Sequence, residues 1–271
     1  MQSFSKLSRR GGALVAAVTL LAGGVAKADI SGFNSGTGWT STGSPAPAPT
    51  FTASTVTLTN TGTQDYAGSA FFNTQQGAAS GFQAQFTYQQ TSTADPSSPG
   101  DGIAFVVQNS ASGASALGGS GGELGYQGIP NSLAVTLDIN QGFPRQDVSA
   151  VGTGGNYDDN TGFATAPVVM DSGHPIQVNL TYTPANQQLV ETLLDQTTND
   201  TISHTFTGID LSSLLGGPNA YVGFTGATGQ FNDTQVVSAF TLTAASAPEP
   251  ASVAILGLGA AGLLIRRRRQ A

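Results

Sequence analysis

The sequence predicts an all-β protein whose body is an antiparallel β-sandwich, with a short apolar helix at each end of the chain. Three observations predict it. Apolar and polar residues alternate in several stretches of the body, as is typical of half-buried strands. Clusters of turn-forming residues separate these stretches. Gly, Thr, Ser, Asn and Gln dominate the composition of the body, and these residues disfavour long helices.

The alternation is strictest in residues 82–88, where Phe82, Phe86 and Tyr88 share one face. Residues 176–182 and 240–243 repeat the same pattern. The other predicted strands are residues 55–60, 69–73, 103–108, 133–139, 188–194, 201–206 and 221–225. One short helix is predicted over residues 211–215, because Asp210 can cap its first turn and Gly216 can end it.

The N-terminal segment has the composition of a signal peptide. Basic residues precede an apolar run at residues 13–25, and Ala26-Lys27-Ala28 supplies a small-x-small cleavage pattern. We therefore expect a signal helix within residues 1–28, cut after Ala28, with Ala26 and Ala28 as the recognised small residues. Gly12 follows the Arg9-Arg10 pair where the twin-arginine motif has a bulky apolar residue, which favours the general secretory route.

The C-terminal segment has three parts. Pro248-Glu249-Pro250 is followed by an uncharged stretch at residues 251–265 and then by four arginines, of which Arg266 and Arg267 are the first. A spanning helix usually needs about 20 residues, so this stretch is short for an ordinary membrane anchor, which is the alternative. The order of the three parts resembles the PEP-CTERM signal that exosortases of Gram-negative bacteria read.

The PEP-CTERM resemblance implies an exported protein that the inner membrane holds transiently through residues 248–271. It implies export machinery and an exosortase as partners, and a final place at the cell surface or in the extracellular matrix. Whether the tail is cleaved or retained stays open. The chain then divides into a signal peptide (1–28), one body domain (29–247) and a sorting segment (248–271).

Charge is separated along the chain. The body carries fifteen acidic residues and one base, Arg145, for a formal charge of −14, whereas the whole chain has −7 because both ends are basic. Such a body repels phosphate backbones and anionic lipid, which argues against nucleic-acid binding. The chain has no cysteine, so burial and backbone pairing must stabilise the exported body without disulfides.

A series of motifs in the body carries a second resemblance. Gly100-Asp101-Gly102 opens the apolar run 103–107, and Asp138 closes the motif at residues 131–138. Further motifs stand at residues 58–62, 67–72, 124–129 and 221–229. In this order they resemble the legume-type (L-type) lectin domain, in its bacterial form, over nearly all of residues 31–243. The resemblance implies a concanavalin-like jelly-roll sandwich with a sugar-binding rim of loops.

The resemblance also implies site residues. Asp101 would accept hydrogen bonds from sugar hydroxyls, and Gly122 or a neighbour in residues 118–122 would offer a backbone amide. Asn140 would add a side-chain bond, while Thr228 and Gly229 would complete the rim. Gly100 stands where the family usually has alanine, and the alternative reading of Asp101 is a turn aspartate between two glycines.

The metal pattern of the family is incomplete here. Thr136 stands where plant lectins have a glutamate, and no histidine follows closely after Asp147, which argues against a manganese-type site. Asp138, Asn140 and Asp147 still offer oxygen ligands, so a calcium site from these three residues stays open.

Three classes of function follow. The first is an exported lectin-like protein that binds a glycan, such as a matrix polysaccharide, without catalysis. The second is a structural matrix protein with a non-functional lectin site. The third is a glycoside hydrolase, which needs two carboxylates about 5–9 Å apart; Glu123 and Glu191 are the only glutamates of the body, and neither has an acidic partner two residues away. The sequence leaves the sugar and the oligomeric state open.

Overall fold

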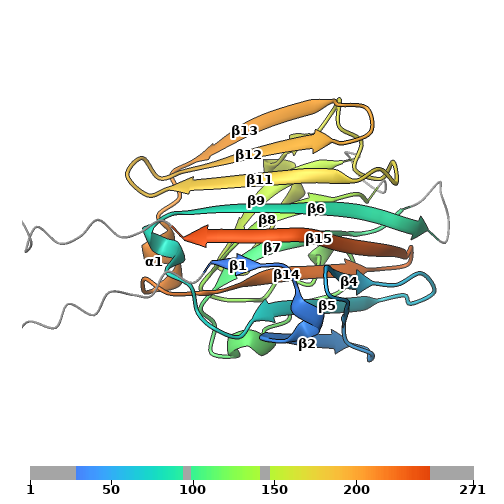
Figure 1. Ribbon diagram of the computed structural model, residues 1–271, viewed down its shortest axis with the longest axis horizontal. Helices are drawn as coiled ribbons and strands as arrows, with labels where there is room; N and C mark the ends of the chain where they lie inside the picture. Colours follow the sequence, from blue (N-terminus) through green and yellow to red (C-terminus); the bar gives the residue numbers. More distant parts are fainter. Residues whose placement is uncertain (1–28, 94–98, 141–146, 245–271) are drawn as a thin grey trace, which may run out of the picture.

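The computed structural model describes residues 29–93, 99–140 and 147–244. Two antiparallel sheets lie face to face and form a β-sandwich (Figure 1), which confirms the predicted fold class. Within these residues, no helix has the length and apolar composition needed to cross a bilayer. The predicted cleavage residues and sorting residues lie outside the described part: Ala26, Ala28, Pro248, Glu249, Pro250, Arg266 and Arg267.

The larger sheet has eight strands. In spatial order they are β13 (Thr201–Thr207), β12 (Gln188–Asp195), β11 (Ile176–Thr183), β6 (Phe82–Thr93), β15 (Asp233–Ala244), β4 (Thr55–Thr59) and β3 (Thr50–Phe51), with β1 (Ile30–Ser31) also paired to β15. The seven-stranded sheet runs β10 (Phe163–Ala164), β9 (Val148–Thr153), β8 (Ser132–Asp138), β7 (Gly102–Gln108), β14 (Tyr221–Thr228), β5 (Tyr66–Phe72) and β2 (Trp39–Ser44).

Helices are few and short among the described residues. The one α-helix, α1 (Leu211–Leu215), begins and ends where the sequence predicts: the Asp210 carboxylate accepts a hydrogen bond from the Ser213 N–H at 3.0 Å, and Gly216 takes a left-handed φ of 65°. The 3-10 turns are η1 (Asn34–Gly36), η2 (Ala78–Ser80), η3 (Gly113–Ser115), η4 (Gly121–Glu123) and η5 (Asp159–Thr161).

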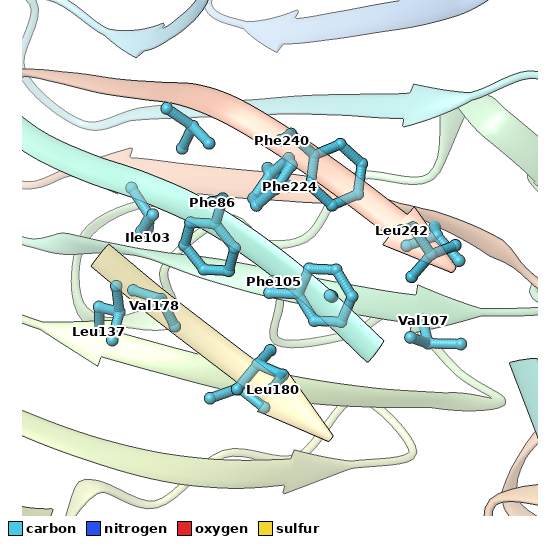
Figure 2. Packing of buried hydrophobic residues seen from close by; sticks show 14 of the residues in the cluster. Phe86, Ile103, Phe105, Val107, Leu137, Val178, Leu180, Phe224, Phe240 and Leu242 are labelled. Atoms are coloured by element: carbon cyan, nitrogen blue, oxygen red, sulfur yellow. The ribbon is translucent and has the colours of Figure 1, made fainter. Parts of the chain in front are cut away.

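The inner faces of the two sheets meet in an aromatic core (Figure 2). Phe86 from β6 lies between Phe105 and Phe224 of the opposite sheet, with ring centroids 6.0 and 5.0 Å away. Phe224 also packs edge-on against Phe240 of β15 at 4.9 Å. The alternation in β6 and in the second half of β15 therefore assigns the buried face correctly.

Loop 109–131 covers the outer face of the seven-stranded sheet. Its Tyr126 is fully buried there, and the Tyr126 hydroxyl lies 3.0 Å from the Ser132 hydroxyl. A second hydrophobic cluster under this loop includes Phe71, Val106 and Ile129. The loop carries η4 toward the end of the sandwich at which β7 begins.

The sandwich has two ends, which we name by their contents. The rim pole is the end at which β7 begins after Asp101 and β14 stops at Thr228. The tail pole is the opposite end, at which β15 stops at Ala244. The pairing of β15 with β6 shows which residues lie at each end of the sandwich. Asp233 pairs with Thr93 at the rim pole, and Ala244 pairs with Phe82 at the tail pole.

Candidate functional site

The backbone of Asp101 is fixed between the ends of three strands at the rim pole. Its N–H donates to the Ala227 carbonyl at 3.0 Å, and its carbonyl accepts from the Ile139 N–H at 2.9 Å. The Gly100–Asp101 peptide bond is cis. Gly102 has a φ of 145°, and a Cβ there would lie 2.2 Å from the Leu137 carbonyl oxygen. Glycine is therefore required directly after Asp101.

The Asp101 carboxyl has one bonded oxygen and one that is not. Its Oδ1 accepts a hydrogen bond from the Asn140 Nδ2 at 3.0 Å. Its Oδ2 is buried and has no hydrogen-bond partner among residues 29–93, 99–140 and 147–244. Such an acceptor is costly to bury, so this oxygen is the unusual feature of the rim.

Gly229 lies beside that oxygen, and Gly121 lies beside Gly229. A Cβ on Gly229 would lie 3.0 Å from Asp101 Oδ2 and 3.3 Å from the Gly121 Cα. The Gly229 backbone faces the carboxyl without reaching regular hydrogen-bond geometry. The carboxyl is 6% exposed, and burial together with the charge of Asp138 raises the pKa of Asp101 to about 7, although the Gly229 N–H opposes the shift.

Asp138 and Asn140 hold each other at the end of β8. Asp138 Oδ1 accepts from the Asn140 backbone N–H at 2.9 Å, and Asp138 Oδ2 accepts from the Tyr157 hydroxyl at 2.7 Å. Asn140 thus reaches Asp101 with its side chain and Asp138 with its backbone. The sequence reasoning missed Tyr157, since nothing in the turn-rich stretch around it indicates which strand it contacts.

The other predicted rim residues differ in what they offer. Thr228 is fully buried, and its hydroxyl donates to the Thr63 carbonyl at 2.7 Å, so its side chain supports the rim from beneath. The Gly229 carbonyl accepts from the Asp65 N–H at 2.9 Å. In η4, Gly121 contacts Gly229, whereas a Cβ on Gly122 would have no described atom within 4 Å. Gly121 therefore lies beside Gly229, which itself lies beside Asp101, while the role predicted for Gly122 or a neighbour stays a prediction.

Phe231 is a second residue that the sequence reasoning missed. It is one of the two exposed large hydrophobic side chains among the described residues, at 39% exposure. A Cβ on Gly100 would lie 3.4 Å from the Phe231 Cβ, which places the start of this side chain beside the Gly100–Asp101 turn. An isolated phenylalanine in the polar turn after Gly229 is the signal that could have found it.

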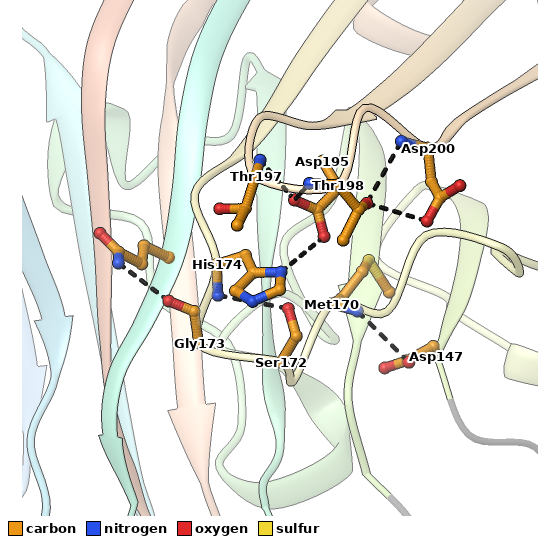
Figure 3. Close-up of polar contacts among 10 residues, drawn as sticks. Asp147, Met170, Ser172, Gly173, His174, Asp195, Thr197, Thr198 and Asp200 are labelled. Atoms are coloured by element: carbon orange, nitrogen blue, oxygen red, sulfur yellow. Dashed lines mark hydrogen bonds and ion pairs between the residues drawn. The ribbon is translucent and has the colours of Figure 1, made fainter.

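The three residues predicted for calcium are only partly brought together. Asp147 Oδ2 accepts from the Met170 N–H at 3.3 Å (Figure 3), and Asp147 Oδ1 is buried with no partner in the described part of the chain. Burial, followed by the charges of Asp171 and Asp138, raises the pKa of Asp147 to about 7. An orphaned buried carboxylate oxygen suits a cation chemically.

Other observations argue against a single metal site formed by Asp138, Asn140 and Asp147. Asp138 already accepts a hydrogen bond on each carboxylate oxygen. The Thr136 hydroxyl, which stands in the place of the family's glutamate, donates to the Ala150 carbonyl at 3.2 Å. The described residues contain no group of three His, Cys, Asp or Glu side chains placed to hold a metal ion. Calcium binding by Asp138, Asn140 and Asp147 stays a prediction.

The network next to Asp147 stabilises a turn. The His174 Nδ1 lies 2.8 Å from Asp195 Oδ2, and Asp195 Oδ1 accepts from the Thr197 and Thr198 N–H groups at 2.7 and 3.1 Å (Figure 3). Burial opposes ionisation, but these bonds hold the pKa of Asp195 below its usual value. The pair fixes the connection from β12 to β13.

Solved structures similar to this chain are plant lectins. The lectin from Bauhinia forficata in complex with GalNAc has a TM-score of 0.67 at 19% identity and covers 82% of this chain and 100% of its own. Arcelin-5, a lectin-like defence protein from Phaseolus vulgaris, has a TM-score of 0.64 at 17% identity, and the match covers 80% of this chain and 97% of arcelin-5. Lectin II from Ulex europaeus has a TM-score of 0.64 at 16% identity and covers 81% and 98%. At these identities the likeness is one of fold.

Comparison by sequence gives a sharper result. No curated protein matches the chain. The PEP-CTERM protein-sorting motif matches residues 246–269, which confirms the resemblance of the tail. The legume lectin domain matches residues 31–254, well over half of the chain, and the chain therefore belongs to the legume lectin family.

Proposed function

We propose that this chain is an exported, surface-sorted protein that binds a glycan through its rim pole, without catalysis. The observation that carries the proposal is Asp101 Oδ2, a buried acceptor with no partner among the described residues, beneath two side-chain-free backbones. Membership of the legume lectin family supports it. The GalNAc complex of the Bauhinia lectin supports a sugar as the class of ligand.

The chemistry of the rim suits sugar hydroxyls. A carboxylate accepts hydrogen bonds from neighbouring hydroxyls, and a glycine amide permits close approach of a ring. Asn140 is fixed on the other carboxylate oxygen and orients the group. Phe231, beside Gly100, offers an apolar face for the ring of the sugar. Gly229 lies beside the buried Oδ2 and Gly121 lies beside Gly229, so we expect these two turns to move apart when a hydroxyl binds there.

The family supports a non-catalytic role, and the placement of the glutamates agrees with it. Glu191 points into the sandwich interior and is fully buried, with the Ser149 hydroxyl at 2.6 Å. Glu123 stands in η4. Glycoside hydrolysis uses two carboxylates that face a groove, and the buried Glu191 does not offer one.

A glycan array with matched variants tests the site. We expect the wild type to bind at least one glycan and Asp101→Ala to lose that binding, since the carboxylate contributes about 1.5–3 kcal/mol per charge-assisted bond. Gly100→Ala is the control, because its new Cβ makes only ordinary contact with Phe231. Binding by Asp101→Ala at wild-type strength would show that the site lies elsewhere. Parallel arrays with a chelator test calcium.

A second candidate is a structural matrix protein that keeps the lectin fold without a working site. The closed contact between Gly121 and Gly229 favours it, as does Thr136 in the place of a metal ligand. This candidate predicts that the wild type binds no glycan with or without calcium.

We further propose that the chain is cleaved at both ends, near Ala28 and around Pro248-Glu249-Pro250. An exosortase would be the partner at the C-terminal tail. These cuts would leave 29–247 as the body domain and place it at the cell surface or in the extracellular matrix. Expression of a tagged chain in a host with an exosortase tests this. An unprocessed chain in the cytosol of that host would contradict it.

A further inference from the structure

The C-terminal end of β15, from which the chain continues to the sorting tail, and the candidate glycan rim lie at opposite poles of the sandwich (Figure 1). β15 has twelve residues, which at about 3.4 Å per residue separate its ends by about 35–40 Å. At one end, the Asp233 carboxylate accepts from the Gly100 N–H at 3.0 Å, directly beside Asp101. At the other end, Ala244 leads into the tail. Ile30 pairs with Leu242, so the first described strand also lies near the tail pole.

The charges follow the same division. Residues 32–38, 73–81, 109–117, 183–188 and 208–220 lie in connections at the tail pole, and Asp210 is the one charged residue in them. The β9–β10 connection also starts at this end but returns toward the rim pole, where Tyr157 donates to Asp138, before Asp158 and Asp159. Asp29, at the start of the described chain, is the second acid near this pole. Carboxylates gather instead at the strand ends and turns of the rim pole. Asp65 and Asp200 are exposed there, whereas Asp101, Asp138, Asp147, Asp195 and Asp233 are buried beneath the same turns.

Electrostatics then gives the two poles different preferences beside a membrane. Carboxylates are repelled by anionic lipid headgroups and lose solvation near a bilayer. The tail pole avoids both costs over most of its surface. The tail that leaves it supplies an apolar stretch and the arginines, which favour anionic lipid.

We propose that, while the sorting tail is engaged, the tail pole faces the membrane surface and the rim pole points away from it. The partner of the tail pole is the lipid surface, brought close by the tail. Given the proposed function of the rim, this orientation leaves the glycan site accessible before the tail is processed. Sorting and glycan binding would then not compete for one surface.

Energy transfer to a bilayer dye tests the orientation. The chain has no cysteine, so a single introduced cysteine carries one donor dye. Ala185→Cys places it on the exposed turn between β11 and β12 at the tail pole, and Gln64→Cys places it on the exposed turn before β5 at the rim pole. The tail-bearing chain, from a host without exosortase, is reconstituted into phosphatidylcholine–phosphatidylglycerol vesicles that carry a headgroup-linked acceptor.

We expect strong energy transfer from the label at position 185 and at least several-fold weaker transfer from the label at position 64. Equal transfer from both positions, stronger transfer from position 64, or no transfer from either would overturn the proposal. The readout needs no glycan, so a failed glycan array leaves this result standing. A failed orientation likewise leaves the array result standing.

Discussion

Asp101 at the rim and Glu191 inside the sandwich are two buried carboxyls with the same local defect. Each has one oxygen in a hydrogen bond, to Asn140 and to Ser149 respectively. Each has a second buried oxygen with no partner among the described residues. In both cases burial is the main cause of a raised pKa, to about 7 for Asp101 and about 8 for Glu191.

The surroundings of the two carboxyls differ. Glu191 faces inward from β12 beside Leu189 and Leu193, and its neighbour across the strand pair is His204. The His204 ring stacks on Phe163 of the other sheet at 4.3 Å. Side chains of two sheets therefore seal Glu191. Asp101 lies instead at an end of the sandwich, with the Gly229 backbone beside its Oδ2 and Gly121 beside Gly229.

An unpartnered buried carboxylate oxygen is thus ambiguous by itself. At Glu191 it lowers stability and gives no route for a ligand. At Asp101 it lies beside the glycine backbone of a turn at the rim, where a ligand hydroxyl can replace the missing partner. Core side chains around such an oxygen indicate a structural carboxyl, whereas turn backbone beside it at the rim indicates a candidate binding site. Substitutions of Glu191 and Asp101 can test this distinction.

Gly102→Ala should have the largest effect, because it breaks the turn that presents Asp101. The new Cβ would lie 2.2 Å from the Leu137 carbonyl oxygen, at a φ of 145° that side chains rarely adopt. We expect a loss of about 4 kcal/mol or more in the free energy of unfolding, measured by denaturant titration. A variant with the unfolding midpoint of the wild type would show that the turn at Asp101 is not fixed as described.

Sequence reasoning found the strands that alternate and those that form continuous apolar runs, such as β7, and missed those with neither pattern. β6 and β11 were predicted because one face is apolar and the other polar. β1, β3 and β10 have two residues each, too few for a pattern. β2 (Trp39–Ser44) consists of small polar residues after Trp39, and β9 (Val148–Thr153) mixes small residues with valines. β15 starts at Asp233, but the register shift and positive φ at Ala239 interrupt its alternation.

At the rim, the sequence could place residues near each other but not their contacts. The motif order placed Asp101, Asn140 and Gly229 in one region, and the structure joins them. It could not distinguish Gly121 from Gly122, because that depends on how η4 turns. Nor could it give the contact between Tyr157 and Asp138, which depends on the path of an irregular loop.

Glu191→Gln should raise stability at neutral and alkaline pH. The carboxyl keeps its proton in the folded state up to about pH 8 but loses it near its ordinary pKa when unfolded. Stability therefore falls as pH rises between these values and is highest at acid pH. Glutamine cannot ionise. We therefore expect the free energy of unfolding of the variant, relative to the wild type, to be about 2–4 kcal/mol higher at pH 8 than at pH 5, as measured by denaturant titration at both pH values.

Two further results would complete the test of Glu191. Glycan binding by Glu191→Gln should equal that of the wild type, because the side chain is sealed away from the rim. If stability of the wild type rises between pH 5 and pH 8 and the variant follows it in parallel, Glu191 is ionised in the folded protein and the comparison fails.

Asp101→Asn should also raise the free energy of unfolding at neutral pH, by a smaller amount than Glu191→Gln does. The folded pKa of about 7 lies above the ordinary value of 3.8, so the wild type loses stability as pH rises toward 7. The amide removes this loss, and we expect a gain of about 2–3 kcal/mol at pH 7 relative to pH 4. Unlike Glu191→Gln, it should abolish glycan binding. Stability gained with binding unchanged would make Asp101 a second structural carboxyl.

Gly100→Ala should have the smallest effect on stability. It changes the residue next to Asp101 and leaves the carboxyl in place, so it separates the role of the carboxyl from that of the turn. Gly100 is not among the described glycines with a left-handed φ. A Cβ there meets Phe231 at 3.4 Å, an ordinary contact, and its N–H can still donate to Asp233. We expect unfolding free energy within about 1 kcal/mol of the wild type and unchanged glycan binding. A loss of binding with the fold intact would mean that Phe231 must move as the rim opens, because the added methyl group restrains that ring and leaves Asp101 untouched.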